Sequence, residues 1–302
     1  MTVAEQIALL RRQIAWAAEK TAFYREAFAS AGVCADDVRT VADMNRLPLL
    51  ERTALEGASA PFFMLALPLS GLLRTSLLRD AGNTRGLLHC YTQGDIARRV
   101  QSATRMLAAA GVNRASTVLL VGDFTDGRIL DLQYASDTIG AMTVPVGAGA
   151  AAADIERILH AVVPDTVVIW EDALPVIAPA LRAQKIEPHR IITIGARIVP
   201  SEETRAICEK IARGHAHLYT DAALGALIGA AMPADAGIFL DERHFFAEVL
   251  DHAGIGHTED GAAGELVLSM TTAEAMPVLR YRTGISARLA RRGTSALYIM
   301  EG

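Results

Sequence analysis

His215 and His217 have the spacing that a metal site on a strand would need. Alternate residues of a strand point to the same face, so a His-x-His pair can present two imidazole nitrogens to one ion. No third ligand stands at a clear spacing from the pair. We therefore predict no metal site, and we interpret the pair as the polar edge of a strand.

Cys90 follows His89 directly, which raises the question of a nucleophile with an adjacent base. Adjacent residues of a strand point to opposite faces, so these two side chains are not expected to form a catalytic pair. The three cysteines are an odd number without a Cys-x-x-Cys pair, which argues against a disulfide framework. A reducing compartment fits best, and we predict a cytoplasmic protein.

The middle of the chain alternates between two kinds of element. Short apolar runs predict strands, and the amphipathic segments between them predict helices, which together indicate parallel βαβ crossovers and a sheet covered on both faces. The predicted strands are 117–122, 142–146, 166–170, 190–195 and 217–219, and the predicted helices are 93–110, 128–140, 153–162, 173–184 and 201–212.

Both ends of the chain depart from this alternation. One amphipathic helix is predicted over 3–31, and an irregular segment with one short helix around Thr53 follows it. From Gly237 onward, strands follow one another without helices, which predicts an antiparallel part. These strands are 245–250, 264–269 and 277–281. We therefore predict an α/β fold with a large α/β domain at 1–236, including the N-terminal helix, and an antiparallel β subdomain at 237–302.

Composition excludes several classes of protein and partner. Of 302 residues, 51% are hydrophobic and 21% are charged, which is enough apolar surface for a large core and unlike a disordered chain. A formal net charge of −5 gives no overall attraction to nucleic acid or to an anionic membrane. The first residues lack the pattern of a signal peptide, and no apolar run reaches the roughly 18 residues of a membrane span. Small molecules and other proteins remain as partners.

Several segments resemble one known family when they are taken in order. The segment RYRTG lies within MPVLRYRTGISARL (276–289) and is preceded by GELVLSM (264–270). Further matching segments are AFYREAFASAGV (22–33), DFTDGRILDLQYASDTIGAMTVPV (123–146) and DERHFFAEVLD (241–251). Over nearly the whole chain they resemble the adenylate-forming superfamily, specifically its phenylacetate–coenzyme A ligase branch. The resemblance implies the fold of that family's large N-terminal domain, and a reaction in which a carboxylate and ATP form an acyl adenylate before transfer to a thiol.

The resemblance also implies a nucleotide site, of which only fragments remain here. RDAGNTRGLLHCYT (79–92) stands where the family has a phosphate loop rich in Ser, Thr and Gly that ends in lysine. Arg79 and Asp80 replace its paired hydroxyls, and an acid in this loop would repel phosphate. Arg85 is the only stand-in for the lysine, with different geometry. The remnants of the nucleotide site are then Gly82, Asn83, Thr84, Arg85, Tyr219 and Arg282, although the first three also suit an ordinary turn and Arg282 also suits a structural ion pair.

Three further features of the family's chemistry are missing. Ala223 stands where a glutamate would hold magnesium, with Asp221 as a weak substitute. Ile285 stands where an aspartate would accept hydrogen bonds from the ribose, so the buried hydroxyls would go unpaired at about 1–3 kcal/mol each. No lysine follows Lys210, and we expect the mobile C-terminal lid to be absent. We therefore expect no catalytic residue, no metal and no cofactor.

A ligand pocket would lie at the family's acyl site. Its expected wall is Phe124, Thr125, Gly127, Tyr134 and Gly195, and its expected ligand is a small aromatic or acyl molecule.

These losses predict a degenerate phenylacetate–coenzyme A ligase-like protein without ATP-dependent ligase activity, acting as a binding or assembly component. One alternative is a minimal carboxylate-activating enzyme that uses ATP, magnesium and coenzyme A and receives its lid from another chain. Another is an interaction protein that forms a homo-oligomer or pairs with an intact paralogue. The apolar segment PFFMLALPLSGLL (61–73) would be its sticky patch if exposed.

Overall fold

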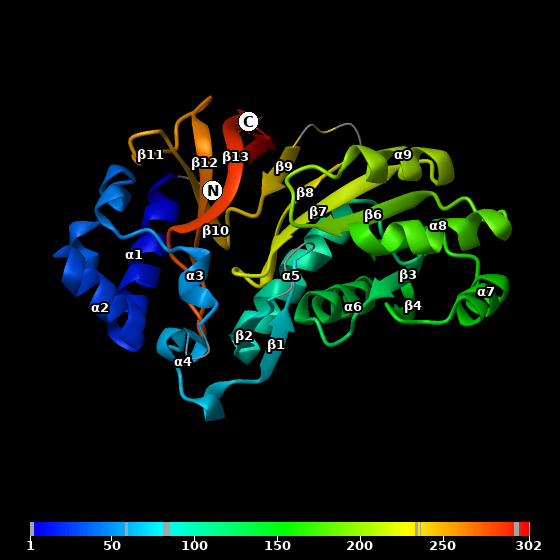
Figure 1. Cartoon of the computed structure of the whole chain (residues 1–302), viewed down its shortest axis with the longest axis horizontal. Coiled ribbons are helices and arrows are strands. Elements are labelled where there is room, and N and C mark those ends of the chain that lie inside the picture. Colours follow the sequence, from blue (N-terminus) through cyan, green and yellow to red (C-terminus); the bar gives the residue numbers. More distant parts are fainter. Residues whose placement is uncertain are drawn as a thin grey trace.

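The computed structural model describes residues 3–57, 60–80, 85–232, 235, 237–292 and 296–301. Over these residues a twelve-stranded mixed sheet runs the length of the molecule, with helices packed on its faces (Figure 1). Its strand order is β11-β10-β12-β13-β14-β9-β8-β7-β6-β5-β3-β4. The α/β prediction is confirmed.

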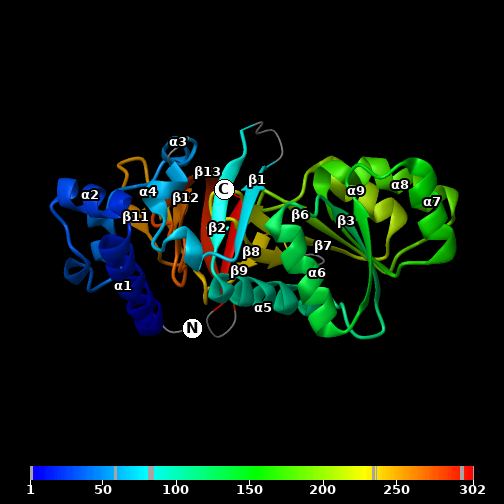
Figure 2. The same ribbon diagram turned by 90° about the horizontal axis from the view of Figure 1, so that it is seen from below.

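The parallel part of the sheet holds five strands between two layers of helices (Figure 2). Val118 and Leu120 pack toward α5 and α6, whereas Leu119 and Val121 pack toward α7, α8 and α9. This alternation buries both faces of the strand, as the apolar runs predicted. The strands are β3 (Thr117–Gly122), β4 (Met142–Gly147), β5 (Thr166–Trp170), β6 (Arg190–Gly195) and β7 (His215–Asp221); the helices are α5 (Gln93–Ala109), α6 (Gly127–Ile139), α7 (Ala152–Ala161), α8 (Leu174–Ala183) and α9 (Glu202–Ile211).

The remaining strands of this sheet are antiparallel to their neighbours. Strand β8, which lies before the predicted boundary at 236/237, pairs with β9, which lies after it, so one hydrogen-bonded sheet contains strands of both predicted parts. The predicted domain boundary there remains a prediction. These strands are β8 (Ala226–Ala231), β9 (Gly237–Leu240), β10 (Phe245–Leu250), β11 (Gly256–His257), β12 (Ala263–Met270), β13 (Tyr281–Arg292) and β14 (Ala296–Glu301).

A two-stranded hairpin and several short helices were not distinguished in the sequence. The hairpin strands pair in antiparallel register, and the second strand lies within the 79–92 segment. The short helix predicted around Thr53 is confirmed as α3. The elements are β1 (Arg74–Leu78), β2 (Leu87–Tyr91), α3 (Arg52–Leu55), α4 (Ala60–Met64) and the 3₁₀ helices η1 (Ala35–Asp37), η2 (Ala42–Arg46), η3 (Leu69–Gly71) and η4 (Glu171–Ala173).

The prediction of one opening helix was wrong, because Thr21 divides it into α1 (Val3–Lys20) and α2 (Ala22–Ala31). Thr21 has extended backbone, and its hydroxyl donates to the carbonyl of Ala17 and accepts from the backbone N–H of Tyr24. A side chain that satisfies the ends of two helices in this way stabilises the break.

The predicted strand over 277–281 was also wrong, because β13 begins only at Tyr281. Arg280 has a φ of 50°, in the left-handed region that interrupts a strand. Its buried guanidinium donates from Nε to Glu248 Oε1 at 2.6 Å and from Nη1 to the carbonyl of Leu47 at 2.6 Å. These bonds hold the start of β13 against β10 and the N-terminal part of the chain.

No helix within the described ranges combines the length and the apolar character needed to cross a bilayer. Cys34, Cys90 and Cys208 are all free thiols. The cytoplasmic location remains a prediction.

Candidate functional site

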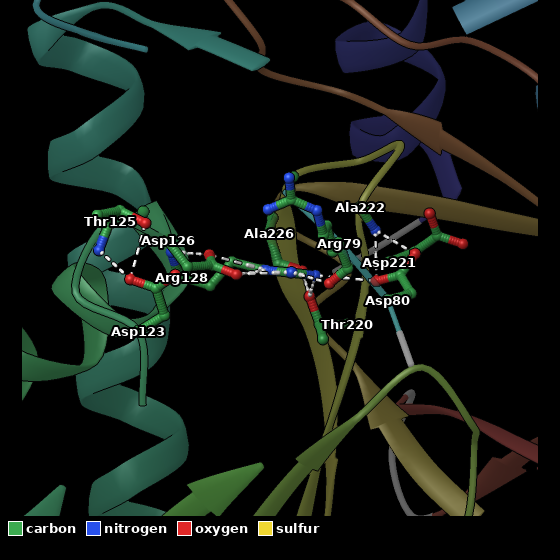
Figure 3. Close-up of polar contacts among 12 residues, drawn as sticks. Arg79, Asp80, Asp123, Thr125, Asp126, Arg128, Thr220, Asp221, Ala222 and Ala226 are labelled. Atoms are coloured by element: carbon green, nitrogen blue, oxygen red, sulfur yellow. Dashed lines mark hydrogen bonds and ion pairs between the residues drawn. The ribbon is translucent and has the colours of Figure 1, made fainter. Parts of the chain in front are cut away.

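Arg128 joins three segments that lie far apart in the sequence (Figure 3). It is the second residue of α6, and Asp126 caps that helix by accepting the backbone N–H of Arg128 at 2.8 Å. The Arg128 side chain is fully buried. A buried guanidinium needs carboxylate and carbonyl partners because it cannot lose its proton.

All three nitrogens of the Arg128 guanidinium have partners. On one side, Nε and Nη2 donate to the Asp126 carboxylate, Nη2 at 2.7 Å. On the other side, Nη1 donates to Asp80 Oδ1 at 3.0 Å, and Nη2 donates to the carbonyl of Arg79 at 2.6 Å. The cation also lies 4.6 Å from the ring centre of Trp170 at the end of β5. We call Arg128, Asp126 and Asp80 the Arg128 network.

Asp80 uses its carboxylate in the way that a bound anion would. Both of its oxygens accept the backbone N–H of Ala222, each at 3.0 Å, just after β7 ends (Figure 3). Arg52 Nη1 lies 3.4 Å from Asp80 Oδ2 on the outer side. A backbone donor and two arginines converge on this position, which is therefore an anion site occupied by a side chain of the chain itself.

A second acid, Asp221, lies beside this carboxylate. It is buried, and Oδ1 accepts the backbone N–H of Ala223 at 2.7 Å. Burial and the negative charge of Asp80 raise the pKa of Asp221 to about 7. Three carboxylates, Asp80, Asp126 and Asp221, thus face two guanidinium groups, Arg52 and Arg128, so a further anion would meet repulsion here.

The described members of the predicted nucleotide site have the following surroundings, and their role in binding a nucleotide remains a prediction. Tyr219 is buried in β7, and its hydroxyl has no hydrogen-bond partner. Arg282 forms ion pairs with Glu265 and Glu51. Arg85 is exposed, 4.0 Å from Glu56. Gly82, Asn83 and Thr84 lie outside the described residues. Ala223 and Ile285, which replace the magnesium and ribose ligands of the family, supply no polar side chain.

The five acyl-pocket candidates have different surroundings, and their role as a ligand-binding wall remains a prediction. Phe124 packs against the core under α5 and α6, while Thr125 donates its hydroxyl to Asp123 at 2.7 Å and is exposed. Tyr134 is also exposed, with Arg74 5.9 Å from its ring centre. A Cβ on Gly127 would meet Ser76 and Arg74, and one on Gly195 would meet Glu171 and His217. Sequence reasoning missed Arg128, whose only local signal is its place two residues after the helix-capping Asp126.

Both histidines of the pair lie within hydrogen-bond distance of the Thr193 hydroxyl on the neighbouring strand β6. His215 Nε2 and His217 Nδ1 lie 2.8 and 3.0 Å from the Thr193 hydroxyl. His217 is buried instead of lying at an exposed edge, and burial lowers the pKa of both histidines to about 4. No cluster of three or more His, Cys, Asp or Glu side chains that could hold a metal occurs in the described part of the chain.

Replacing Arg128 tests the network directly. Arg128→Met leaves Asp80 and Asp126 buried without their main cation, and we expect a loss of about 3–5 kcal/mol in the free energy of unfolding by urea. Arg157→Met is the matched control, because Arg157 is exposed and 4.0 Å from its acid; its expected effect is below about 1 kcal/mol. Equal effects of the two variants would contradict the assigned role of Arg128.

Asp221 predicts a dependence of stability on pH. The pKa of Asp221 is raised in the folded state, so folding favours the protonated acid. The free energy of unfolding that depends on this proton is fully present below about pH 4 and is lost as the pH rises to about 7. Asp221→Asn keeps an oxygen for Ala223 but carries no charge. We expect this variant to gain on the order of 2 kcal/mol over the native chain between pH 5 and pH 8 in urea unfolding. Asp154→Asn, at an exposed site, should show no such trend, and a gain that is independent of pH would refute the assignment.

Comparisons with known proteins identify the relationship. No protein-family model matches the chain. It is 26% identical over 297 residues to phenylacetate-coenzyme A ligase of Pseudomonas putida and 28% identical over 297 residues to that of Aromatoleum evansii. Each alignment covers 94% of this chain and 66% of the relative, so the chain spans just under two thirds of their length.

The solved structures agree in fold. An open conformation of 2-hydroxyisobutyryl-CoA ligase, in complex with 2-HIB-AMP and CoA, superposes with a TM-score of 0.85 at 16% identity over 98% of this chain and 72% of that one. The same ligase in the thioesterification state gives 0.86 at 17% identity over 99% of this chain and 67% of that one. The chain is a homologue of the phenylacetate–coenzyme A ligases and has the fold of the N-terminal region of adenylate-forming ligases.

Proposed function

We propose that this protein is a phenylacetate–coenzyme A ligase-like binding or assembly component that does not activate carboxylates with ATP. The observation that carries the proposal is the position of Asp80. Its carboxylate accepts a hydrogen bond from the backbone N–H of Ala222 and forms an ion pair with buried Arg128. The family resemblance assigns this place to phosphate.

The residues around Asp80 do not fit a magnesium–ATP complex. A phosphate group would have to displace a carboxylate that is held by a backbone donor and a buried guanidinium. It would then meet Asp221, whose pKa is already raised by burial and by the charge of Asp80. The side chains of Ala223 and Ile285 offer no oxygen for a metal ion or a ribose. Nothing would then offset the repulsion between phosphate and the acids or the loss of water from the nucleotide.

Nucleotide binding and pyrophosphate exchange test this proposal together. We expect calorimetry with ATP, AMP and magnesium to give no heat of binding at millimolar nucleotide. We also expect no exchange of labelled pyrophosphate into ATP with a panel of aryl and acyl carboxylates. The ligase of Pseudomonas putida is the positive control. Saturable ATP binding by the native chain, or exchange above the protein-free rate, would overturn the proposal.

The assembly half of the proposal depends on an exposed apolar surface. Phe62, Phe63, Leu69 and Leu73 are between 54% and 66% exposed, on α4, η3 and the chain that leads into β1. Leu77 and Leu88 form an exposed cross-strand pair on the β1–β2 hairpin. Figure 1 shows α4 and β1 along the lower rim of the molecule. Apolar side chains gathered in this way are typical of a surface that another protein covers.

Sedimentation tests whether this surface joins copies of the chain. We expect a concentration-dependent dimer at micromolar protein that is lost in Leu73→Ser/Leu77→Ser, because serine removes the apolar area buried by association. Val176→Ser on α8 is the matched control, since Val176 is equally exposed but far from the hairpin in sequence. A native chain that remains a monomer at micromolar concentration would contradict the proposal that this surface joins two copies of the chain.

A further inference from the structure

A separate cavity lies beside the first half of α5, between that helix, β2, β8 and the chain that links β12 to β13. We call it the Arg99 pocket and define it by Arg99, His244, Cys90, Leu227, Met270 and Met276. Its interior admits water over about 40 Å³. This is room for roughly three water molecules or for a compact organic molecule of a few heavy atoms.

Arg99 brings an unsatisfied cationic donor to this pocket. Its Nε donates to Asp131 Oδ2 at 2.7 Å, and its guanidinium lies 4.3 Å from the ring centre of Tyr91. Nη2 has no hydrogen-bond partner, and water cannot easily supply one because nine tenths of the Arg99 side chain is inaccessible to solvent. The other oxygen of Asp131 is taken by Arg74 at 2.5 Å, so one carboxylate serves two guanidinium groups.

His244, another residue of the pocket wall, brings a second unpaired nitrogen. Its Nδ1 lies 2.9 Å from the hydroxyl of Thr272, while Nε2 is buried without a partner. Burial lowers the pKa of His244, so the ring is neutral. If the Thr272 hydroxyl donates to Nδ1, the proton resides on Nε2, which is then a buried donor on a residue that lines the pocket. Unmade hydrogen bonds at two buried nitrogens are costly unless a ligand or water accepts them.

The remaining walls decide what kind of molecule fits. Cys90, Leu227, Phe245, Met270 and Met276 present carbon and sulfur, and methionine adapts to the shape of a ligand. Two carboxylates also line the pocket, and both are already paired: Asp95 accepts from Arg98 and from backbone N–H groups, and Asp131 accepts from Arg74 and Arg99. A donor that cannot lose its proton favours an anionic oxygen over a neutral one. We infer that the Arg99 pocket binds a small apolar anion, with its charged oxygens toward Arg99 and His244 and its hydrocarbon part against the two methionines.

The Arg99 pocket and the Arg128 network have different members, because none of Arg128, Asp126 and Asp80 lines the pocket. Arg74, which shares Asp131 with Arg99, also donates to the carbonyl of Gly127 at 3.1 Å, so the two sites are neighbours. The inference rests on the proposed function, because a ligand held there is bound without being activated.

Binding without nucleotide tests the inference. The probes are butyrate, butyramide, 1-butanol and butylammonium, which share a carbon chain and differ in the head group. By calorimetry and ligand-detected NMR, we expect butyrate to bind, butyramide to bind at least tenfold more weakly, and the alcohol and the ammonium ion not to bind. Binding of butylammonium equal to that of butyrate, or no binding of butyrate at millimolar concentration, would refute the inference and leave only ordered water in the pocket.

Two variants locate the site by different means. Arg99→Met removes the cationic donor, while Ala226→Leu fills the pocket from β8 and leaves the ion pairs in place. Each should weaken butyrate binding at least tenfold, and the second keeps the test valid if the first fails to fold. Arg105→Met is the matched control on α5, because Arg105 also has a buried unpaired nitrogen but lines another cavity. Butyrate binding unchanged in Ala226→Leu would overturn the inference. Because no ATP is present, this outcome is independent of the nucleotide test.

Discussion

The burial of Arg128 is the constraint on which the rest of the site depends. A guanidinium without access to water must be matched by acceptors on every side. These come from Asp126 at the start of α6, from Arg79 and Asp80 after the end of β1, and from Thr220 in β7. An ion pair of this kind contributes little net stability compared with an apolar core, but it is strongly destabilising when one partner is lost. Its main effect is therefore to specify how these three segments meet.

That arrangement changes what the family's fold can do here. The backbone donor at Ala222 and the cations at Arg52 and Arg128 still form a place for negative charge. Asp80 occupies it from within the chain, and Asp221 adds a second acid that is already difficult to ionise. An anion site that is satisfied internally supports the proposal that no phosphate binds there, whereas the buried nitrogens Arg99 Nη2 and His244 Nε2 have no hydrogen-bond partner.

Prediction from sequence succeeded where the pattern is local. The strands Thr117–Gly122, Thr166–Trp170 and Arg190–Gly195 were predicted with their observed bounds, because runs of β-branched residues buried on both faces have a strong signal. It failed at Thr21 and Arg280, where a single side chain breaks an element through contacts that composition does not encode. The hairpin β1–β2 was missed because each of its strands has only five residues, too few for a clear pattern.

The sequence by itself determined the α/β alternation and the antiparallel end, and it shows Ala223 and Ile285 where the family resemblance implies magnesium and ribose ligands. These depend on residue identity at single positions and on periodicity, which are local properties. Only the tertiary structure decided that Asp80 meets Ala222 and Arg128, and that Arg99 and His244 face one pocket, because their partners lie 142, 48 and 145 residues apart along the chain, the last being the difference between 244 and 99. Such pairings arise from the packing of whole elements, which no local pattern specifies.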